Sequence, residues 1–312
     1  MDPFPPLSIG YLSVAPGISL RYGQAQSPVE PTLGTILLIQ GRGEFIEKYY
    51  ETAQNFLTLG YHVVTFDWRG QGLSSRLLKN RQKGYIDSYD TYISDLHFII
   101  LSLIHKSENH FVLAVAHSMG GHILARYLDR EPNCIFDGII LSAPMIDIAK
   151  NRFSRYGLWS LSFLMVELGF GQSYAVGMKN YGDADRDFAK NRRTHDPVRF
   201  QREVTAIINC PDLALGGITW SWLYATMVSI LKLRQSVRKH QSTKILIISA
   251  GDEKIVRNQA QKDYAIKNRC SHIYIIENSY HEIMQETNEI RSQFWAHALN
   301  FIKTLPISMI KK

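Results

Sequence analysis

The chain has 312 residues, of which 45% are hydrophobic, enough for a large buried core and about one and a half domains of average length. Its three cysteines, Cys134, Cys210 and Cys270, are widely spaced and form no CxxC pair, which argues against a disulfide framework and against a zinc site. The net charge of +7 would suit a nucleic-acid partner, but no nucleic-acid-binding motif appears, so we expect none.

Two features bear on where the protein acts. Residues 1–6 carry no basic segment and no long apolar stretch follows, so we predict no secretory signal and, with the unpaired cysteines, a cytoplasmic location. Basic residues gather at Arg192-Arg193 and between Arg234 and Lys244. They form either an ordinary solvated surface or a peripheral contact with the anionic inner face of the membrane, where each such residue contributes about 1 kcal/mol.

The first part of the chain reads as strands separated by glycine-rich turns. Residues 11–14 and 18–22 predict an edge hairpin whose strands are separated at Pro16-Gly17. A buried strand is expected over 34–40, followed by the turn Gly41-Arg42-Gly43-Glu44, which can aim a backbone N–H at an oxyanion. Another is expected over 61–66, and the charged turn after it, Asp67 to Ser74, is interpreted as structural scaffolding.

The most informative motif is Ala116-His117-Ser118-Met119-Gly120. An apolar run over 111–116 leads into it, and helix-forming residues follow at 122–127. A serine between a strand and a helix, with small residues two positions before and after it, is typical of a nucleophile elbow, which exposes the serine hydroxyl above the sheet. A serine in an ordinary tight turn is the alternative.

The middle of the chain, from about 143 to 242, shows no clear buried strand and predicts an inserted helical cap; residues 1–142 and 243–312 would then form the core. Two apolar helices are expected, over 156–166 and 218–228, each too short to span a bilayer. They either pack on each other and the core, or line an acyl-binding cleft with Trp220, Trp222 and His117, or reach a membrane interface. The polar span 179–202 is expected to be a solvated loop of the cap.

The last part of the chain supplies an acid and a base in order. A strand over 244–250 precedes Asp252 and Glu253, and a strand over 272–277 precedes His281. A carboxylate after a late strand can orient a histidine base. The spacing acid-x-Ile-Val favours Glu253, whereas Asp252 is the more usual residue type, and Asp252 remains the alternative. An amphipathic helix is expected over 290–302.

These stretches resemble the serine-hydrolase branch of the α/β-hydrolase superfamily that holds bacterial lysophospholipases and monoacylglycerol lipases. The matching segments extend from about Ile36 to Glu286: QGRGEFIEKYY, FDWRGQGLS, AHSMGGHILARYL, LSAPM, ALGGITWSWL, SAGDEKIV and YHEIMQE. The resemblance implies an α/β fold with a mostly parallel sheet flanked by helices. It also implies a triad of Ser118, His281 and Glu253 (or Asp252), with the N–H groups of Arg42 and Met119 as oxyanion donors. Gln40 departs from it, since many relatives have histidine there.

We therefore expect a serine hydrolase that cleaves the ester of a single-acyl lipid, a lysophospholipid or a monoacylglycerol, through an acyl-enzyme and without a metal or organic cofactor. The same fold and triad occur in enzymes that act on many different substrates. The alternatives are a small-substrate esterase, an aminopeptidase, and a catalytically silent lipid-binding module. An aminopeptidase would need a cap carboxylate for the substrate ammonium, and Glu167 is the only acid within the apolar cap stretches. Oligomeric state is not predicted.

Overall fold

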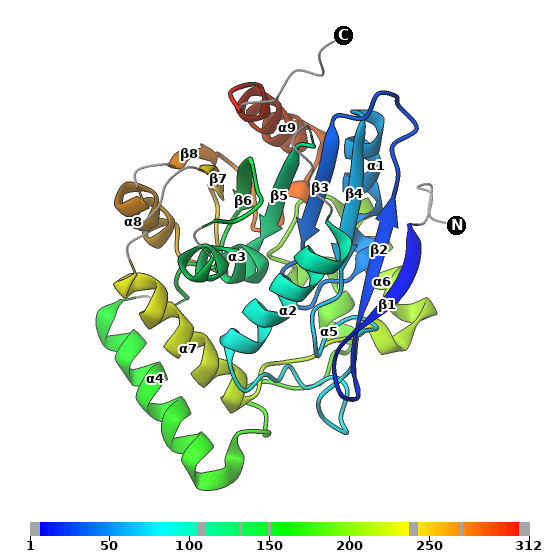
Figure 1. Cartoon of the computed structure of the whole chain (residues 1–312). Helices are drawn as coiled ribbons and strands as arrows, with labels where there is room; N and C mark the ends of the chain where they lie inside the picture. The colour runs from blue at the N-terminus through cyan, green and yellow to red at the C-terminus, as the bar shows by residue number, and fades with distance from the viewer. Residues whose placement is uncertain are drawn as a thin grey trace.

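An eight-stranded sheet forms the centre of the molecule, in a computed structural model that describes residues 7–104, 110–131, 133–148, 151–236, 243–268 and 271–305 (Figure 1). The strand order is β1-β2-β4-β3-β5-β6-β7-β8. The strands are β1 (Ser8–Ala15), β2 (Ile18–Ala25), β3 (Gly34–Ile39), β4 (Tyr61–Phe66), β5 (Val112–His117), β6 (Gly138–Ser142), β7 (Lys244–Ala250) and β8 (Ser271–Ile276). The expected strands are thus confirmed to within a few residues.

The sheet is parallel except at one edge. β1 pairs antiparallel with β2, and β2 pairs antiparallel with β4, whereas all other neighbouring strands are parallel. The β1–β2 pair confirms the predicted edge hairpin. β3, β5 and β6 are buried along their whole length, as expected for central strands that are covered on both faces.

Helices cover both faces of the sheet. The apolar residues of one face pack with α1 (Tyr50–Thr58) and α9 (Asn288–Lys303). Those of the other face pack with α2 (Tyr89–Leu103), α3 (Ser118–Arg130) and α8 (Asn258–Asn268). α9 confirms the predicted C-terminal helix.

Between β6 and β7 the described regular elements are all helical. They are α4 (Arg152–Met165), η2 (Val166–Phe170), α5 (Asp183–Arg186), η3 (Phe188–Lys190), α6 (Pro197–Asn209), η4 (Pro211–Leu213) and α7 (Trp220–Gln235). α4 and α7 cover most of the two predicted apolar ranges, 156–166 and 218–228, and pack on each other at the lower left of Figure 1. The linkers 149–150 and 237–242, which include part of the second predicted basic cluster, lie outside the described residues, as does Cys270.

The expectation of a solvated loop over 179–202 is wrong for its second half. Thr194 and Arg199 are buried, and α6 lies against η1 (Ile46–Tyr49) and α1 of the core. Three arginines of this half form ion pairs with carboxylates of the core, which the polar composition alone did not reveal. Arg193, part of the first predicted basic cluster, is one of them, because its guanidinium pairs with Glu203 and Glu282.

Parallel strands bring the predicted site residues to one edge of the sheet. Gly41, Ser118, Glu253 and His281 follow the carboxyl ends of β3, β5, β7 and β8, respectively. In open α/β sheets this is the edge at which ligands bind.

Candidate active site

Ser118 is at the turn between β5 and α3, as the motif predicted. Its φ angle is +48°, a left-handed conformation that costs a non-glycine residue free energy and is found where function requires it. The small residues around it permit close packing: a Cβ on Gly120 would lie 2.4 Å from the carbonyl oxygen of Gln40. The serine side chain is held at the end of the sheet by this close contact between α3 and β3.

Ser118, His281 and Glu253 form one hydrogen-bonded chain. His281 Nε2 lies 2.8 Å from Ser118 Oγ, and His281 Nδ1 lies 2.7 Å from Glu253 Oε2. A carboxylate can only accept, so Nδ1 carries the proton and donates to Glu253, which leaves Nε2 to accept from the serine hydroxyl. This tautomer is the one in which histidine can take a proton from serine.

Of the two candidate acids, the structure brings only Glu253 to the histidine. Glu253 also accepts hydrogen bonds from the N–H groups of Ile255, at 2.7 Å, and Val256, at 3.2 Å. Asp252 is exposed, and its backbone N–H donates to Ser279. Burial raises the pKa of Glu253, but the hydrogen bond and charge of His281 and the two N–H donors outweigh burial, so the pKa lies below its usual value. Glu253 is therefore ionised at neutral pH.

The turn after β3 lies next to the serine. A Cβ built on Gly41 would be 3.2 Å from Ser118 Cβ. The Arg42 N–H has no hydrogen-bond acceptor within the described ranges, and the Met119 N–H is in the first turn of α3, where N–H groups have no helical partner. The Arg42 side chain donates through Nη2 to the carbonyl of Gly216, 2.5 Å away. The backbone N–H groups of Arg42 and Met119 therefore remain available to an oxyanion.

The three residues that the sequence suggested for substrate binding are all buried by protein. The His117 ring lies 4.8 Å from the ring of His281, and its Nδ1 is 3.2 Å from the carbonyl oxygen of Ser142. Trp220 packs with apolar residues of α7 and α4, and the ring of Trp222 lies 6.3 Å from Tyr89 in the core. This burial supports the alternative that the two apolar helices pack on each other and on the core. A substrate-binding role for these three residues stays a prediction.

Several residues around the site were missed. Glu44 accepts a hydrogen bond from the Gly41 N–H at 2.5 Å, and Gln71 accepts one from the Gly43 N–H at 2.5 Å. Lys48 and Glu282 lie beside Glu44 in a buried ion-pair cluster. The i, i+4 spacing of Glu44 and Lys48 within QGRGEFIEKYY was the available sequence signal. Among the described residues, no three His, Cys, Asp or Glu side chains are grouped so that they could hold a metal ion.

A model of the family described as serine aminopeptidase, S33, matches residues 30–288, which is most of the chain. The chain belongs to this family. The family consists of α/β-hydrolases. The sheet order and the elbow at Ser118 agree with this membership, and the expected fold class is confirmed. The resemblance inferred from the motifs is thereby confirmed.

Relatives and solved structures match this chain over most of its length. The chain is 31% identical to the "Probable lysophospholipase L2" of Haemophilus influenzae over 284 residues, 90% of this chain and 87% of the relative. It is 28% identical to "Lysophospholipase L2" of Escherichia coli K12 over 82% of this chain and 76% of the relative. A soluble variant of monoglyceride lipase from Saccharomyces cerevisiae superposes with a TM-score of 0.75 at 18% identity, covering 97% and 96% of the two chains. That structural match supports the fold alone.

Proposed function

We propose that the protein is a serine hydrolase that cleaves the carboxylic ester of a single-acyl lipid, a lysophospholipid or a monoacylglycerol. The observation that carries the proposal is the hydrogen-bonded chain Ser118–His281–Glu253 at a strained elbow. His281 removes the proton from Ser118 as Oγ attacks the ester carbonyl, and ionised Glu253 stabilises the imidazolium that forms. The protonated His281 then donates to the leaving alcohol.

The backbone N–H groups of Arg42 and Met119 hold the negative charge of the tetrahedral intermediate. Each such preorganised donor lowers the barrier by about 3 to 4 kcal/mol. Water then attacks the acyl-enzyme by the same route, with His281 as base, and the fatty acid leaves. Each step uses only groups of this chain and water.

The substrate class rests on the relatives and on the inserted segment. The relatives from Haemophilus influenzae and Escherichia coli, which match over most of their length, carry the name lysophospholipase, and these names are the reason to place the ester in a lipid. Residues 143–242 act as a cap over the core of 1–142 and 243–312. Their apolar helices α4 and α7 supply side chains suited to an acyl chain.

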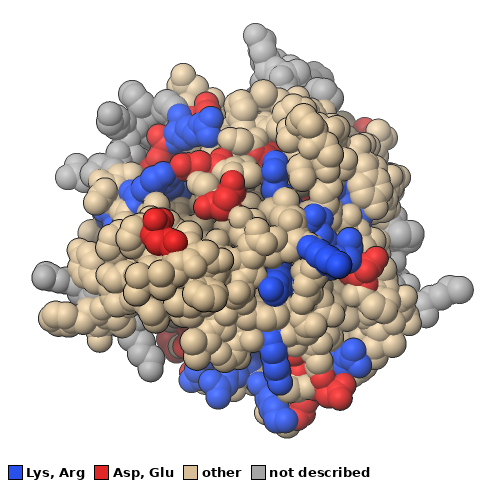
Figure 2. Space-filling model, turned by 90° about the horizontal axis from the view of Figure 1, so that it is seen from below, with Lys and Arg blue, Asp and Glu red and all other residues tan. Residues whose placement is uncertain are grey.

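The cap also has an apolar outer surface. Phe153, Leu164 and Leu168, on α4 and η2, are 82%, 52% and 60% exposed. In Figure 2 the left-hand lobe, where α4 lies in Figure 1, is largely free of Lys, Arg, Asp and Glu. Within the described ranges, no helix has the length and apolarity that crossing a bilayer requires. We infer that this surface contacts the membrane peripherally, at the inner face if the protein is cytoplasmic.

An aminopeptidase is the second candidate, because the family description carries that word. It would require a carboxylate near Ser118 to bind the substrate ammonium. Glu167, the acid that the sequence suggested, is exposed on η2 rather than enclosed in the cap. The ester reaction is therefore favoured.

The test compares wild type with Ser118→Ala on lysophosphatidylcholine, a monoacylglycerol of equal chain length, p-nitrophenyl butyrate and an alanine p-nitroanilide. We expect fatty-acid release from at least one lipid by wild type, and a decrease of about 10⁴-fold or more in Ser118→Ala. Turnover of p-nitrophenyl butyrate alone would indicate a small-substrate esterase, and turnover of the anilide an aminopeptidase. No turnover of any substrate, with no labelling by a fluorophosphonate, would indicate a binding module.

A further inference from the structure

A buried cluster of charged side chains lies behind the candidate active site. Its members are Glu44, Lys48, Arg193, Glu203 and Glu282. All but Arg193 have side chains no more than 6% exposed. We call these five residues the Lys48 cluster. Ionised groups are rarely buried without a reason, because each loses several kcal/mol of hydration.

Lys48 is the centre of the cluster. Its Nζ lies 2.7 Å from Glu282 Oε1, 2.8 Å from Glu203 Oε2 and 3.1 Å from Glu44 Oε1. The contact with Glu282 is a hydrogen bond, and those with Glu203 and Glu44 are ion pairs. Burial lowers the pKa of Lys48, but the charges of Glu203, Glu282 and Glu44 raise it far above its usual value. The lysine therefore stays charged at neutral pH.

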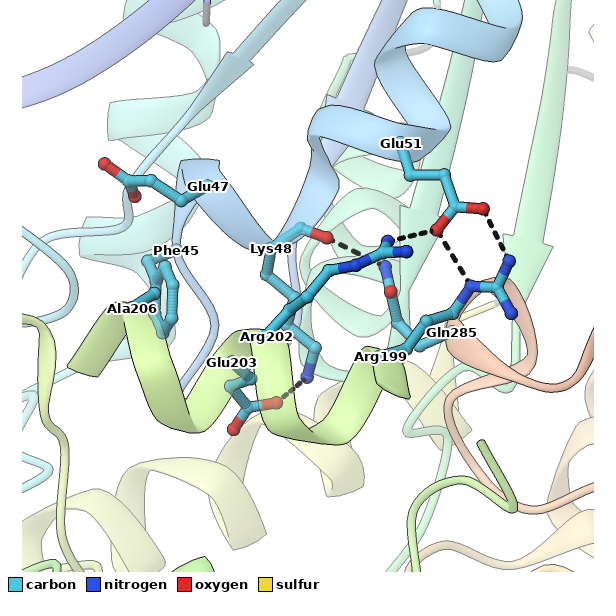
Figure 3. Close-up of a pocket in the computed structure, with 9 residues that line it drawn as sticks. All are labelled: Phe45, Glu47, Lys48, Glu51, Arg199, Arg202, Glu203, Ala206 and Gln285. Carbon is cyan, nitrogen blue, oxygen red and sulfur yellow. Dashed lines mark hydrogen bonds and ion pairs between the residues drawn. The ribbon is translucent and has the colours of Figure 1, made fainter. Parts of the chain in front are cut away.

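The three carboxylates come from different functional parts of the molecule. Glu44 ends the turn that carries Arg42, Glu282 directly follows His281, and Glu203 belongs to α6 of the inserted segment. Figure 3 shows Lys48 extending from η1 toward Glu203. Gln285 lies in residues 281–285, which we call the histidine loop, and its side chain donates to the Lys48 carbonyl at 3.0 Å. One residue thus contacts the turn, the histidine loop and the cap.

Two of the three contacts continue toward a reacting group through a further bond. Glu44 Oε2 accepts from the Gly41 N–H, at 2.5 Å, and from the Tyr49 hydroxyl, at 2.7 Å, so it fixes the Gln40–Gly41 peptide, one before the peptide that carries the Arg42 N–H. The Glu282 N–H donates to the Arg193 carbonyl at 2.8 Å, so the residue after His281 is held at both its backbone and its side chain.

From this geometry we propose that Lys48 is a positioning residue: through Glu44 and Glu282 it keeps the Arg42 amide and His281 in register with Ser118. The proposal rests on the serine-hydrolase function proposed above. Through Glu203 the same lysine joins α6 to the site, so that α6 of the cap is held in one position relative to the active site.

The experiment measures steady-state hydrolysis of p-nitrophenyl butyrate by wild type, Lys48→Met and Lys48→Arg. It also measures the affinity for a short alkyl boronic acid, which forms a tetrahedral adduct with a serine hydroxyl. We expect Lys48→Met to lower kcat by about 10- to 100-fold, because small displacements of reacting groups cost this much. KM should change little, the boronic acid should bind more weakly by a similar factor, and Lys48→Arg should recover part of the loss.

Glu51→Gln is the matched control. Glu51 also joins α1 of the core to α6, where it pairs with Arg199 at 2.5 Å and Arg202 at 2.7 Å (Figure 3). Within the described part of the chain, its ion pairs are with arginines and none is with Arg42 or His281. It should lower stability and leave kcat near that of wild type. Equal kcat losses in Lys48→Met and Glu51→Gln, or a wild-type kcat in Lys48→Met, would overturn the proposal.

If Lys48→Met does not fold, Glu282→Gln decides, because it weakens the contacts of Glu282 with Lys48 and Arg193 and leaves those of Lys48 with Glu44 and Glu203 in place. A lower kcat supports the proposal and an unchanged kcat overturns it. Failure of the proposed function has a different signature: wild type itself would hydrolyse neither lipids nor p-nitrophenyl butyrate. Wild type active on p-nitrophenyl butyrate but not on lipids would change the substrate class and leave the test of Lys48 intact.

Discussion

Ser118 combines two properties that rarely occur in one residue: it is almost completely buried and its backbone is in a left-handed conformation. The helix α3 that begins there and the β3 end that contacts Gly120 hold it in place. Its hydroxyl is thereby presented to His281 rather than to bulk water. The strain is compensated by the packing of the surrounding elements.

The identity of the acid is the sharpest prediction at the residue scale. Glu253→Gln should lower kcat by about 10³- to 10⁴-fold, because it removes the charge that stabilises the imidazolium and that fixes the His281 tautomer. Asp252→Asn, one position earlier and exposed, should keep kcat within a few-fold of wild type. Steady-state assays with p-nitrophenyl butyrate check both. The reverse order of effects would show that the histidine pairs with Asp252 during turnover.

Two glycines in helices allow a matched pair of variants. Gly120→Ala should destabilise the protein by about 1 to 3 kcal/mol, because its Cβ would meet the backbone carbonyl of Gln40. Gly157→Ala, in the interior of α4 with no atom within 4 Å of a built Cβ, should stabilise it by about 0.5 to 1 kcal/mol. Urea unfolding of each variant measures both changes. A destabilised Gly157→Ala would show that α4 is not helical at that position.

At the scale of elements, the two long helices of the cap differ in what they contact. α7 is buried by α4 on one side and by the core on the other, with Trp222 against Tyr89. α4 packs on α7 with one face and leaves an apolar face outside. A helix that is apolar on both sides needs a partner on the second side, and a lipid surface is the partner that we propose.

This assignment predicts membrane binding through α4. The double variant Phe153→Glu, Leu164→Glu should bind vesicles of phosphatidylglycerol and phosphatidylcholine at least about tenfold more weakly, because each apolar side chain contributes about 1.5 to 3 kcal/mol when it leaves water. Turnover of soluble p-nitrophenyl butyrate should remain unchanged. Ile266→Glu, at an exposed apolar position of α8, is the control and should bind like wild type. Equal binding by all three proteins would rule out α4 as the docking element.

At the scale of the whole molecule, α6 is joined to the core by ion pairs as well as by apolar packing of Ile207 with Phe45. Glu51 of α1 is surrounded by Arg199, Arg202 and Arg291. Burial raises the pKa of Glu51, but the hydrogen bonds and charges of these arginines lower it to about 2. Because the usual pKa is higher, the ion pairs contribute stability that is fully present above about pH 4.5 and lost as the pH falls toward 2.

The pH dependence of stability tests this contribution. At pH 7 the free energy of unfolding of Glu51→Gln should be about 3 kcal/mol lower than that of wild type. At pH 3.5 the difference should be smaller by about 1 kcal/mol, because Glu51 is then largely protonated in the unfolded chain but still ionised in the folded protein, whereas Gln does not titrate. Urea unfolding at both pH values measures it. A difference that does not change with pH would mean that Glu51 contributes through packing rather than charge.

The sequence by itself determined the strands of the parallel sheet, the elbow at Ser118 and the position of His281. These are local: an apolar run, a turn and a helix-forming segment occur within a few residues, and chain order in a parallel sheet brings their ends to one edge. The same holds for the hairpin before residue 25 and for α9 near the end of the chain. The helical character of the insertion was likewise readable from the absence of a buried strand pattern.

The tertiary structure alone decided what depends on contacts between distant segments. Asp252 and Glu253 are adjacent in sequence, and only the direction in which β7 ends places Glu253 against His281. The polar span 179–202 has the composition of a loop, yet Arg199 and Arg193 within it pair with Glu51 and Glu282, more than 80 residues away. The i, i+4 spacing of Lys48 indicated Glu44 alone, and nothing in the sequence indicated its contacts with Glu203 and Glu282. Charge pairing across the fold has no periodicity along the chain, so no local pattern can reveal it.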